Sequence, residues 1–342
     1  MKKNESIIRK KWPLDDKIKV SVCCITYNQD QYISEAIESF LNQSTTFPFE
    51  IIISDDFSTD NTLSIIEKYK KNYPNLIKII AGKSNVGANN NLLRVMNSAS
   101  GDYIALCEGD DFWCDYLKLE KQYKLMKDNS EVVLSYHSAY ILTGNERKLD
   151  YVKDDIFHNA LDVINHHYGC FSPTASYMFK RNLVDNLPCW FSDAPIGDYF
   201  IELYGMKDGK GLYIDEPMSV YRQMADNSWS SSIHGNVEKY VSMRLNMIDF
   251  YHKTKKDFPE YNFLIDDRIL AVYIVIMRWL ILHADFNQFN NYSEVSSYIK
   301  KYAFKNIKSK RLMIKFSMYK MFSFLSINNK LRVGKLFRKI SK

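Results

Sequence analysis

Short apolar runs alternate with stretches of helical periodicity over the first 136 residues. The runs that predict strands are 19–27, 50–56, 77–82, 103–111 and 132–136. The stretches in which apolar residues recur every three or four positions, and which predict helices, are 32–41, 63–69 and 92–96. Several runs are too apolar to have a solvent face, so we expect an α/β fold of βαβ units with a largely parallel sheet covered on both faces.

The rest of the chain is less regular. It predicts a strand within 171–182, a short helix over 197–209 that ends at Gly209, and a strand over 218–222. From 237 onward the pattern is mostly helical, and the run 269–284 is apolar nearly all round. Because this run has only about 16 residues and contains Arg278, it predicts a buried core helix and no transmembrane helix.

Composition and charge narrow the class of protein. A chain of 342 residues with 46% hydrophobic content can bury a substantial core. The six cysteines form no CxxC pair, and the basic N-terminus has no apolar segment behind it, so we interpret the cysteines as reduced thiols of a cytoplasmic protein.

The net charge of +6 is unevenly distributed. The segment 295–342 holds 14 Lys and Arg and no acid, so the remainder of the chain is acidic on balance, which argues against nucleic-acid binding. Apolar residues are interleaved with the basic ones in this tail. It is predicted either to lie peripherally on an anionic membrane surface or to pack on the rest of the protein with its lysines in water.

Polar and acidic side chains follow three of the predicted strands. They are Thr26, Tyr27 and Asn28 after the first, Asp55 and Asp56 after the second, and Glu108, Asp110 and Asp111 after the fourth. Ligands of such sheets bind at the carboxyl ends of the strands, so these side chains should converge on one rim. Acids clustered without compensating bases repel one another, and a hard divalent cation such as Mg²⁺ or Mn²⁺ would relieve that repulsion.

Structural explanations for these acids have to be weighed as well. Asp55 and Asp56 lie in a segment rich in Ser, Asp and Asn, where they can form turns and cap a helix. For Asp55 we favour a ligand contact, because it ends an apolar strand. Three acids within four residues around Gly109 gain nothing from packing, which favours function for that group.

Four ordered motifs then identify a family. The segments VSVCCITYNQDQYISEAIESFLNQ, IIISDDFSTDNT, NVGANNN and GDYIALCEGDDFWCDYLKLEKQ, over about 18–136, resemble the inverting, GT-A fold glycosyltransferases of family 2. The resemblance implies an N-terminal extension over 1–17, a catalytic domain over 18–235 and a helical region with the basic tail over 236–342. Within the domain, 18–136 would bind the nucleotide and 137–235 the acceptor.

The resemblance also assigns roles to the acids and their neighbours. Thr26, Tyr27 and Asn28 would line the nucleobase and ribose site, and Asp55 would accept a hydrogen bond from the base, as similar enzymes do with uracil. Glu108, Gly109 and Asp110 stand where the family has its DxD motif. Because the first acid here is Glu108, we assign the metal to Asp110 and Asp111 and give Glu108 a supporting or ribose role.

Inverting transfer also needs a carboxylate that takes the acceptor proton. Asp198, at the start of a predicted helix, is the best candidate, although an acid there could simply stabilise the helix dipole. Asp193 and Asp215 are weaker alternatives.

Other side chains have weaker expectations. Arg222 and Trp229 are candidate diphosphate and acceptor contacts, and Trp113 either stacks on a sugar or anchors the next helix. Gln223 or Met224 stands where the family often has a histidine, which His234 could replace. By position, Pro173, Thr174 and Ser176 resemble the part of the fold that faces the donor sugar.

The resulting prediction is a metal-dependent transferase that moves a sugar from a UDP-linked donor to an acceptor hydroxyl of a surface polysaccharide or glycolipid. One alternative is a nucleotidyltransferase, which would be expected to carry a Gly-rich loop after its first strand, whereas TYNQDQY has no glycine. The other is a non-catalytic binding or scaffolding protein, of which loss of the acids would be the mark.

Overall fold

The computed structural model describes residues 4–13, 17–166, 170–226, 228, 231, 233 and 236–283. It divides into two compact units, one up to Ser232 and one from Ile233, and each is described by itself.

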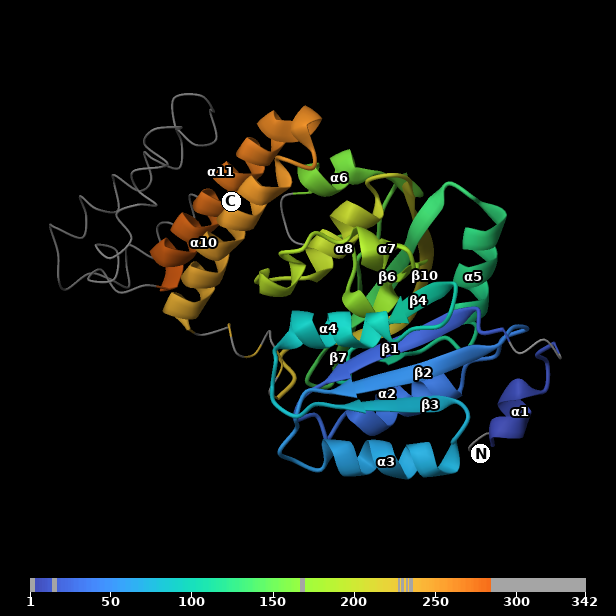
Figure 1. Ribbon diagram of the computed structural model, residues 1–342. Helices are drawn as coiled ribbons and strands as arrows, with labels where there is room; N and C mark the ends of the chain where they lie inside the picture. The colour runs from blue at the N-terminus through green and yellow to red at the C-terminus, as the bar shows by residue number, and fades with distance from the viewer. Residues whose placement is uncertain are drawn as a thin grey trace, which may run out of the picture. The chain divides into compact units, whose positions relative to one another are not determined.

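The first unit is built on one ten-stranded sheet (Figure 1). Its strands are β1 Val20–Thr26, β2 Phe49–Asp55, β3 Ile77–Ala81, β4 Tyr103–Leu106, β5 Phe112–Trp113, β6 Val132–Thr143, β7 Glu146–Asp150, β8 Phe157–His158, β9 Met178–Lys180 and β10 Lys210–Arg222. Its helices are α1 Glu5–Arg9, α2 Ile33–Leu41, α3 Thr62–Asn72, α4 Ala88–Asn97, α5 Lys118–Asp128, α6 Ala160–Asn165, α7 Leu183–Asn186 and α8 Asp198–Gly205, with 3-10 turns η1 Thr174–Ser176 and η2 Phe191–Asp193.

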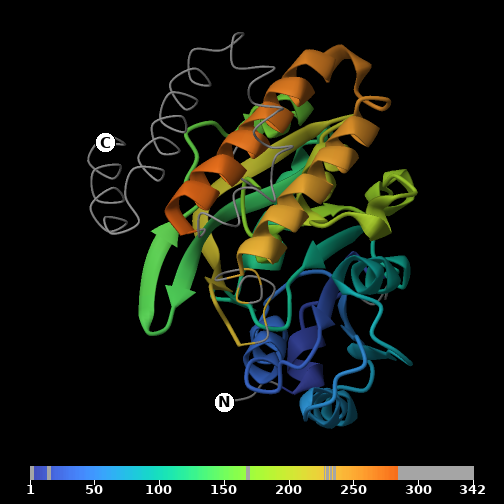
Figure 2. The same ribbon diagram turned by 90° about the vertical axis from the view of Figure 1, so that its left-hand side faces the viewer.

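The strand order places β1 between β2 and β4, among the four parallel strands. The order is β3-β2-β1-β4-β9-β6-β10-β5, with β7 paired to β6 and β8 to β10. The first four strands are parallel, and β1 pairs with both β2 and β4. Their carboxyl ends therefore meet at one edge. Beyond them the sheet is mixed, because β9 is antiparallel to both β4 and β6. In Figure 2 the hairpin of β6 and β7 extends from the sheet, and all five residues of β7 are exposed.

Both faces of the parallel part are covered, as its continuous apolar runs predict. Val22 and Cys24 on β1 share a core cluster with Ile37 and Phe40 of α2. The residue between them, Cys23, points the other way, and its thiol lies 3.7 Å from the carbonyl oxygen of Val95 in α4. Helices α2 and α4 thus pack on opposite faces of the sheet (Figure 1).

The structure confirms the α/β prediction and corrects several details. The three helices predicted in the first half are α2, α3 and α4, and the strand predicted within 171–182 is the short, antiparallel β9. Helix α8 ends at Gly205, four residues before the expected stop at Gly209. The strand predicted at 218–222 is the end of the longer β10, which contains Pro217 and shifts register against β6 between Ile214 and Ser219.

The second unit is described by its helices α10 Val237–Thr254 and α11 Asn262–His283, joined through the 3-10 turn η3 Pro259–Tyr261. The apolar run that begins at Ile269 lies largely within α11, where Ile269, Val272 and Ile276 are buried. Within the described ranges, no helix has the length and apolar character needed to cross a membrane.

Glu50 joins the strands of the sheet at the end opposite the carboxyl edge. Its carboxylate is buried, accepts hydrogen bonds from Ser21 Oγ at 2.7 Å and Ser100 N at 2.8 Å, and forms an ion pair with Lys78 at 2.5 Å. Burial alone would raise its pKa, but the hydrogen bonds from Lys78, Ser100 and Ser21 outweigh burial and lower the pKa below its ordinary value of 4.5.

We predict that Glu50→Gln lowers the free energy of unfolding by about 1–3 kcal/mol at neutral pH. Because the folded pKa is depressed, the stabilisation by ionised Glu50 is present above about pH 4.5 and is lost as the pH falls through the folded pKa. In urea unfolding across this range, the difference between wild type and Glu50→Gln should shrink on acidification. The exposed Asp208→Asn is the control, and a difference that is constant with pH would contradict the prediction.

Candidate functional site

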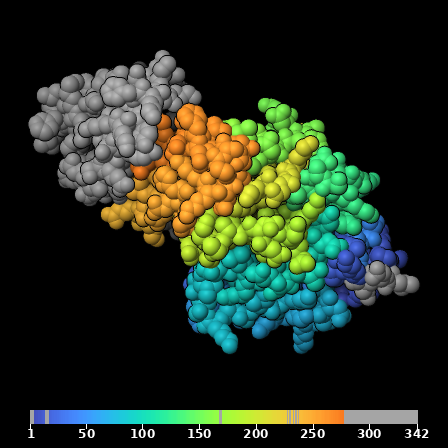
Figure 3. Space-filling view, turned by 45° about the horizontal axis from the view of Figure 1, so that its top comes forward, coloured from blue at the N-terminus to red at the C-terminus, as the bar shows by residue number. Residues whose placement is uncertain are grey.

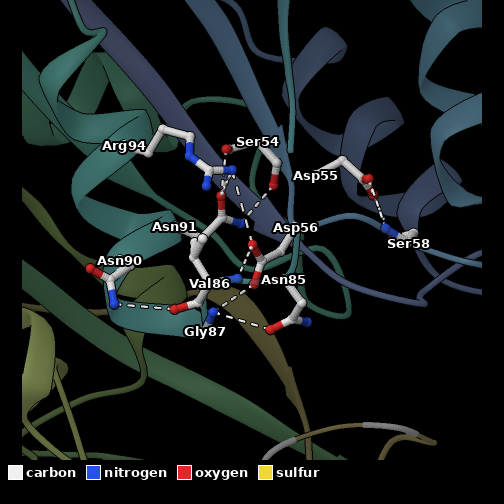
Figure 4. Close-up of polar contacts among 10 residues, drawn as sticks. All are labelled: Ser54, Asp55, Asp56, Ser58, Asn85, Val86, Gly87, Asn90, Asn91 and Arg94. Carbon is white, nitrogen blue, oxygen red and sulfur yellow. Dashed lines mark hydrogen bonds and ion pairs between the residues drawn. The ribbon is translucent and has the colours of Figure 1, made fainter. Parts of the chain in front are cut away.

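The carboxyl ends of β1 and β2 lie side by side, with Thr26 in register with Asp55. Asp55 is buried and accepts hydrogen bonds from the backbone N–H of Ser58 at 2.9 Å and from its hydroxyl at 2.5 Å (Figure 4). Ser58 Oγ also accepts the N–H of Asn28, a residue with φ of 51°. The Asn28 side chain in turn accepts the N–H of Thr59 at 2.8 Å. These bonds fix the two loops that follow β1 and β2 against each other.

Asp56 organises the loop that precedes α4. Its two carboxylate oxygens accept the N–H groups of Val86 and Gly87, each at 2.9 Å, and Arg94 approaches to 4.0 Å (Figure 4). Gly87 has φ of 86°, a conformation that favours glycine. Asp56 therefore has a structural role, and so does Asn91, which exchanges hydrogen bonds with Ser54 of β2.

Gly109 allows the acidic loop after β4 to approach the end of β1. A methyl group at Gly109 would lie 2.5 Å from Gln29 Oε1 and 2.8 Å from Thr26 Oγ1. The Thr26 hydroxyl donates to Gln29 Oε1 at 2.7 Å, and the Gln29 side chain also hydrogen-bonds Asp110, which opposes the rise that burial causes in the pKa of Asp110. Gln29 thus connects the nucleotide-side loop to the acids, a role that sequence reasoning missed because nothing local in TYNQDQY points to Asp110.

Burial raises the pKa of each of the three acids of the loop. Burial raises the pKa of Glu108 to about 8, and the charges of Asp110 and Asp198 add to the shift. Asp111 is fully buried, and burial together with Asp110 and Glu108 raises its pKa well above the ordinary value. Its Oδ1 accepts the backbone N–H of Arg222 at 2.8 Å, whereas its buried Oδ2 has no hydrogen-bond partner. Carboxylates crowded in this way favour a bound cation.

Arg222, at the end of β10, is the basic side chain that reaches this loop. Its guanidinium donates to the carbonyl oxygen of Asp110 at 2.7 Å and forms an ion pair with Glu35. It also lies 5.1 Å from the ring centre of Tyr32 and 4.7 Å from that of Phe112. Of the two roles weighed for Arg222, its contacts in this structure are those of a salt-bridge partner.

Asp198 begins α8, and its charge, with that of Asp110, adds to the rise that burial causes in the pKa of Glu108. Burial raises the pKa of Asp198 itself, against hydrogen bonds from Cys170 and from the backbone N–H of Tyr199. Asn89 of α4 donates to the carbonyl oxygen of Ala194 at 2.6 Å and so ties the loop before α8 to α4. The corresponding yellow-green and teal regions lie against each other in Figure 3.

The two weaker candidates for the base have other surroundings. Asp193 is exposed in η2, and Asp215 accepts the hydroxyl of Tyr213 at 2.9 Å. Neither acid contributes to the pKa shifts of the acidic loop.

Trp113 is a core residue, and we correct the sugar contact considered for it. The residue is 4% exposed, its indole N–H donates to the carbonyl oxygen of Ala175 at 2.8 Å, and its ring packs on Phe40 with 4.8 Å between ring centres. The ammonium of the buried Lys118 lies 4.2 Å from the ring centre. Of the two interpretations, anchoring of the helix that follows, α5, fits these contacts.

The remaining predicted residues have mixed positions. Tyr27 is 39% exposed at the rim, and Met224 is exposed with φ of 63°. Thr174 and Ser176 form η1 after Pro173, next to β4. Trp229, His234 and the basic tail lie outside the described residues. In the part of the chain that the structure describes, no three His, Cys, Asp or Glu side chains are grouped so as to hold a metal by themselves.

Comparison with known proteins places this site in a family. The sequence model described as Glycosyl transferase family 2 matches residues 21–186, which include the strand ends and the acidic loop. An uncharacterized protein of Mycobacterium tuberculosis is 35% identical over 214 residues, covering 62% of this chain and 61% of that protein. The dTDP-rhamnosyl transferase RfbG of Shigella flexneri is 26% identical over 241 residues, covering 67% and 80%. Residues 21–186 therefore form a family 2 glycosyltransferase region, and the chain spans about three fifths of the length of the mycobacterial relative.

A solved structure shows the same fold. The crystal structure of S. aureus TarS 1–349 in complex with UDP-GlcNAc has a TM-score of 0.65 with 15% sequence identity, covering 94% of this chain and 92% of that one. At this identity the likeness shows the fold, which is the predicted GT-A fold with C-terminal helices.

We predict that Gly109→Ala lowers the free energy of unfolding by about 1–3 kcal/mol, because the added methyl group must push Gln29 or Thr26 aside. Gly205→Ala is the matched control, since its methyl group would lie 3.2 Å from the terminal methyl groups of Leu134 and Leu183 rather than against polar groups. Its effect on the free energy of unfolding should stay within about 1 kcal/mol. Urea unfolding measures both. Equal stability of Gly109→Ala and wild type would show that the loops are not packed as described.

Proposed function

We propose that the protein transfers a sugar from a nucleotide-sugar donor to an acceptor hydroxyl, with inversion at the anomeric carbon. The observation that carries this proposal is the convergence of the acidic loop, which follows β4, and Asp198 of α8, whose charge adds to the rise that burial causes in the pKa of Glu108. One set of carboxylates could then hold a cation that would neutralise the charge of the leaving diphosphate, while a separate carboxylate accepts a proton. Inversion is carried over from the family resemblance.

The proposed base and ribose site comprises Thr26, Tyr27, Asn28 and Asp55. Asp55 can accept an N–H of the base edge only by sharing oxygens that already accept from Ser58. Carboxylate oxygens have that capacity, since each can accept two hydrogen bonds. A uracil or thymine base would each supply such an N–H. TarS binds UDP-GlcNAc in its crystal structure, and RfbG is a dTDP-rhamnosyl transferase. Both support this class of ligand, and we propose a UDP sugar.

We further propose that Asp110 and Asp111 hold a divalent cation, Mn²⁺ or Mg²⁺, with Glu108 supporting them or contacting the ribose. The unpartnered Oδ2 of Asp111 and the raised pKa values of Asp110 and Asp111 fit this assignment. One or two protein carboxylates suffice when substrate phosphates complete the coordination. When bound, the cation would neutralise the charge that develops on the diphosphate. Arg222 would add positive charge beside it.

In the proposed reaction, the acceptor hydroxyl attacks the anomeric carbon from the face opposite the diphosphate, and the bond to the diphosphate oxygen breaks. Asp198 takes the hydroxyl proton as the new bond forms. Burial raises the pKa of Asp198, which brings its basicity closer to the pH at which the enzyme works. Surface polysaccharide or glycolipid is the proposed acceptor class, and peripheral contact of the basic tail with the membrane is part of that proposal.

We predict that UDP binding measured by isothermal titration requires both Mn²⁺ and Asp110. Asp110→Asn should weaken binding at least about tenfold, or about 1.4 kcal/mol, because it removes a negative ligand, while Asp208→Asn should bind as wild type does. Titrations with GDP and dTDP test the base preference. Failure of all three nucleotides to bind with metal present would remove the donor site and favour the scaffolding alternative.

Asp198→Asn should abolish transfer and leave donor binding intact. General acid–base catalysis contributes about 10²–10⁴-fold, so we expect a fall in kcat of at least about 100-fold with an unchanged dissociation constant for UDP. The assay follows UDP release from UDP sugars in the presence of candidate acceptors. Turnover by Asp198→Asn at the wild-type rate would overturn the assignment of the base.

A further inference from the structure

Helix α8 carries two acids one turn apart, and so far only the first has a role. Asp198 and Glu202 are separated by four residues and lie on the same face of the helix. Asp198 is partly exposed, whereas Glu202 is 0% exposed. A carboxyl group at this depth is costly to bury, and an apolar residue would fill the space without that cost. Its contacts therefore need an explanation.

Glu202 binds the segment that precedes β9. Its Oε1 accepts the backbone N–H of Phe171 at 2.7 Å and the hydroxyl of Tyr177 at 2.6 Å, while Oε2 has no partner. The same Tyr177 hydroxyl lies 2.8 Å from the carbonyl oxygen of Ser172. One carboxylate oxygen thus fastens two points of the segment 171–177 to the second turn of α8.

The residue just before that segment contacts the proposed base. The Cys170 side chain hydrogen-bonds Asp198 and thereby opposes the rise in pKa that burial causes. The Asp198 Oδ1 also accepts the N–H of Tyr199 at 2.9 Å. Because a carboxylate can only accept, the Cys170 thiol is the donor, and its position follows from the backbone of Phe171.

We propose that Glu202 is a positioning residue for Asp198: it fixes Phe171, and through it Cys170, so that the thiol donates to the Asp198 carboxylate and holds it in one orientation. The inference rests on the proposed function, since it assumes that Asp198 is the base. It adds a residue that does not touch substrate and acts through the backbone of a neighbouring segment.

The first test measures the thiol directly and needs no substrate. In the full chain with Cys114→Ser and Cys189→Ser, which replace the exposed cysteines, the rate of Cys170 alkylation by iodoacetamide is followed at fixed pH by mass spectrometry. Glu202→Ala should raise this rate at least about fivefold, because the thiol loses its place beside the carboxylate that suppresses its ionisation. Asp198→Asn should raise it similarly. Glu202→Gln keeps an acceptor for Phe171 and Tyr177 and should stay within about twofold.

Alkylation of Glu202→Ala at the parental rate would overturn the proposal. Where Glu202→Ala does not fold, Tyr177→Phe removes one of the two donors to Oε1, and an unchanged rate in that variant overturns it equally.

The second test separates this inference from the proposed function. Glu202→Ala and Cys170→Ala should each lower kcat about tenfold or more and leave the dissociation constant for UDP within about twofold, with Glu202→Gln close to wild type. If Asp198→Asn is inactive but Glu202→Ala and Cys170→Ala turn over normally, only the positioning role fails. If Asp198→Asn turns over normally, the base assignment fails and the positioning role fails with it.

Discussion

Burial raises the pKa of Glu108, Asp110 and Asp111 above the ordinary range, and the charge of Asp110 adds to the rise at Glu108 and at Asp111. Much of the surrounding structure serves to keep them together despite this cost. The short distance from Gly109 to the end of β1 admits no side chain, and Gln29 donates a compensating hydrogen bond to Asp110. The fold therefore holds these buried acids together before any ligand binds. A ligand that brings positive charge into this loop would stabilise their charged forms.

The supporting bonds run between elements that are distant in sequence. Asp56 holds the loop before α4, Arg222 closes over the acidic loop from β10, and its ion pair with Glu35 anchors it to α2. Such contacts depend on the register of the sheet, which aligns Thr26 with Asp55. The rim is consequently a product of strand order as much as of the motifs themselves.

Sequence alone predicted the parts of this arrangement that are local. The apolar runs fixed the first strands, and the strand-end rule correctly brought the ends of β1, β2 and β4 to one edge. What sequence could not supply was pairing: that Gln29 meets Asp110, or that the Trp113 ring points into the core toward Phe40. The strand β9 was predicted but its antiparallel pairing was not, and the early end of α8 was missed, since both depend on tertiary packing that overrides local pattern.

Asn89 of α4 donates a hydrogen bond to the carbonyl oxygen of Ala194. This bond joins α4 to the loop that precedes Asp198. Gly197 in that loop packs so closely on Asn89 that a methyl group there would collide with it. If related chains exchange the segment that contains α8, the contact between Asn89 and the loop before α8 must be preserved. A chimaera whose crossover lies between α4 and η2 inherits Asn89 and Gly197 from different parents, so recombination here should succeed only between parents that share both residues.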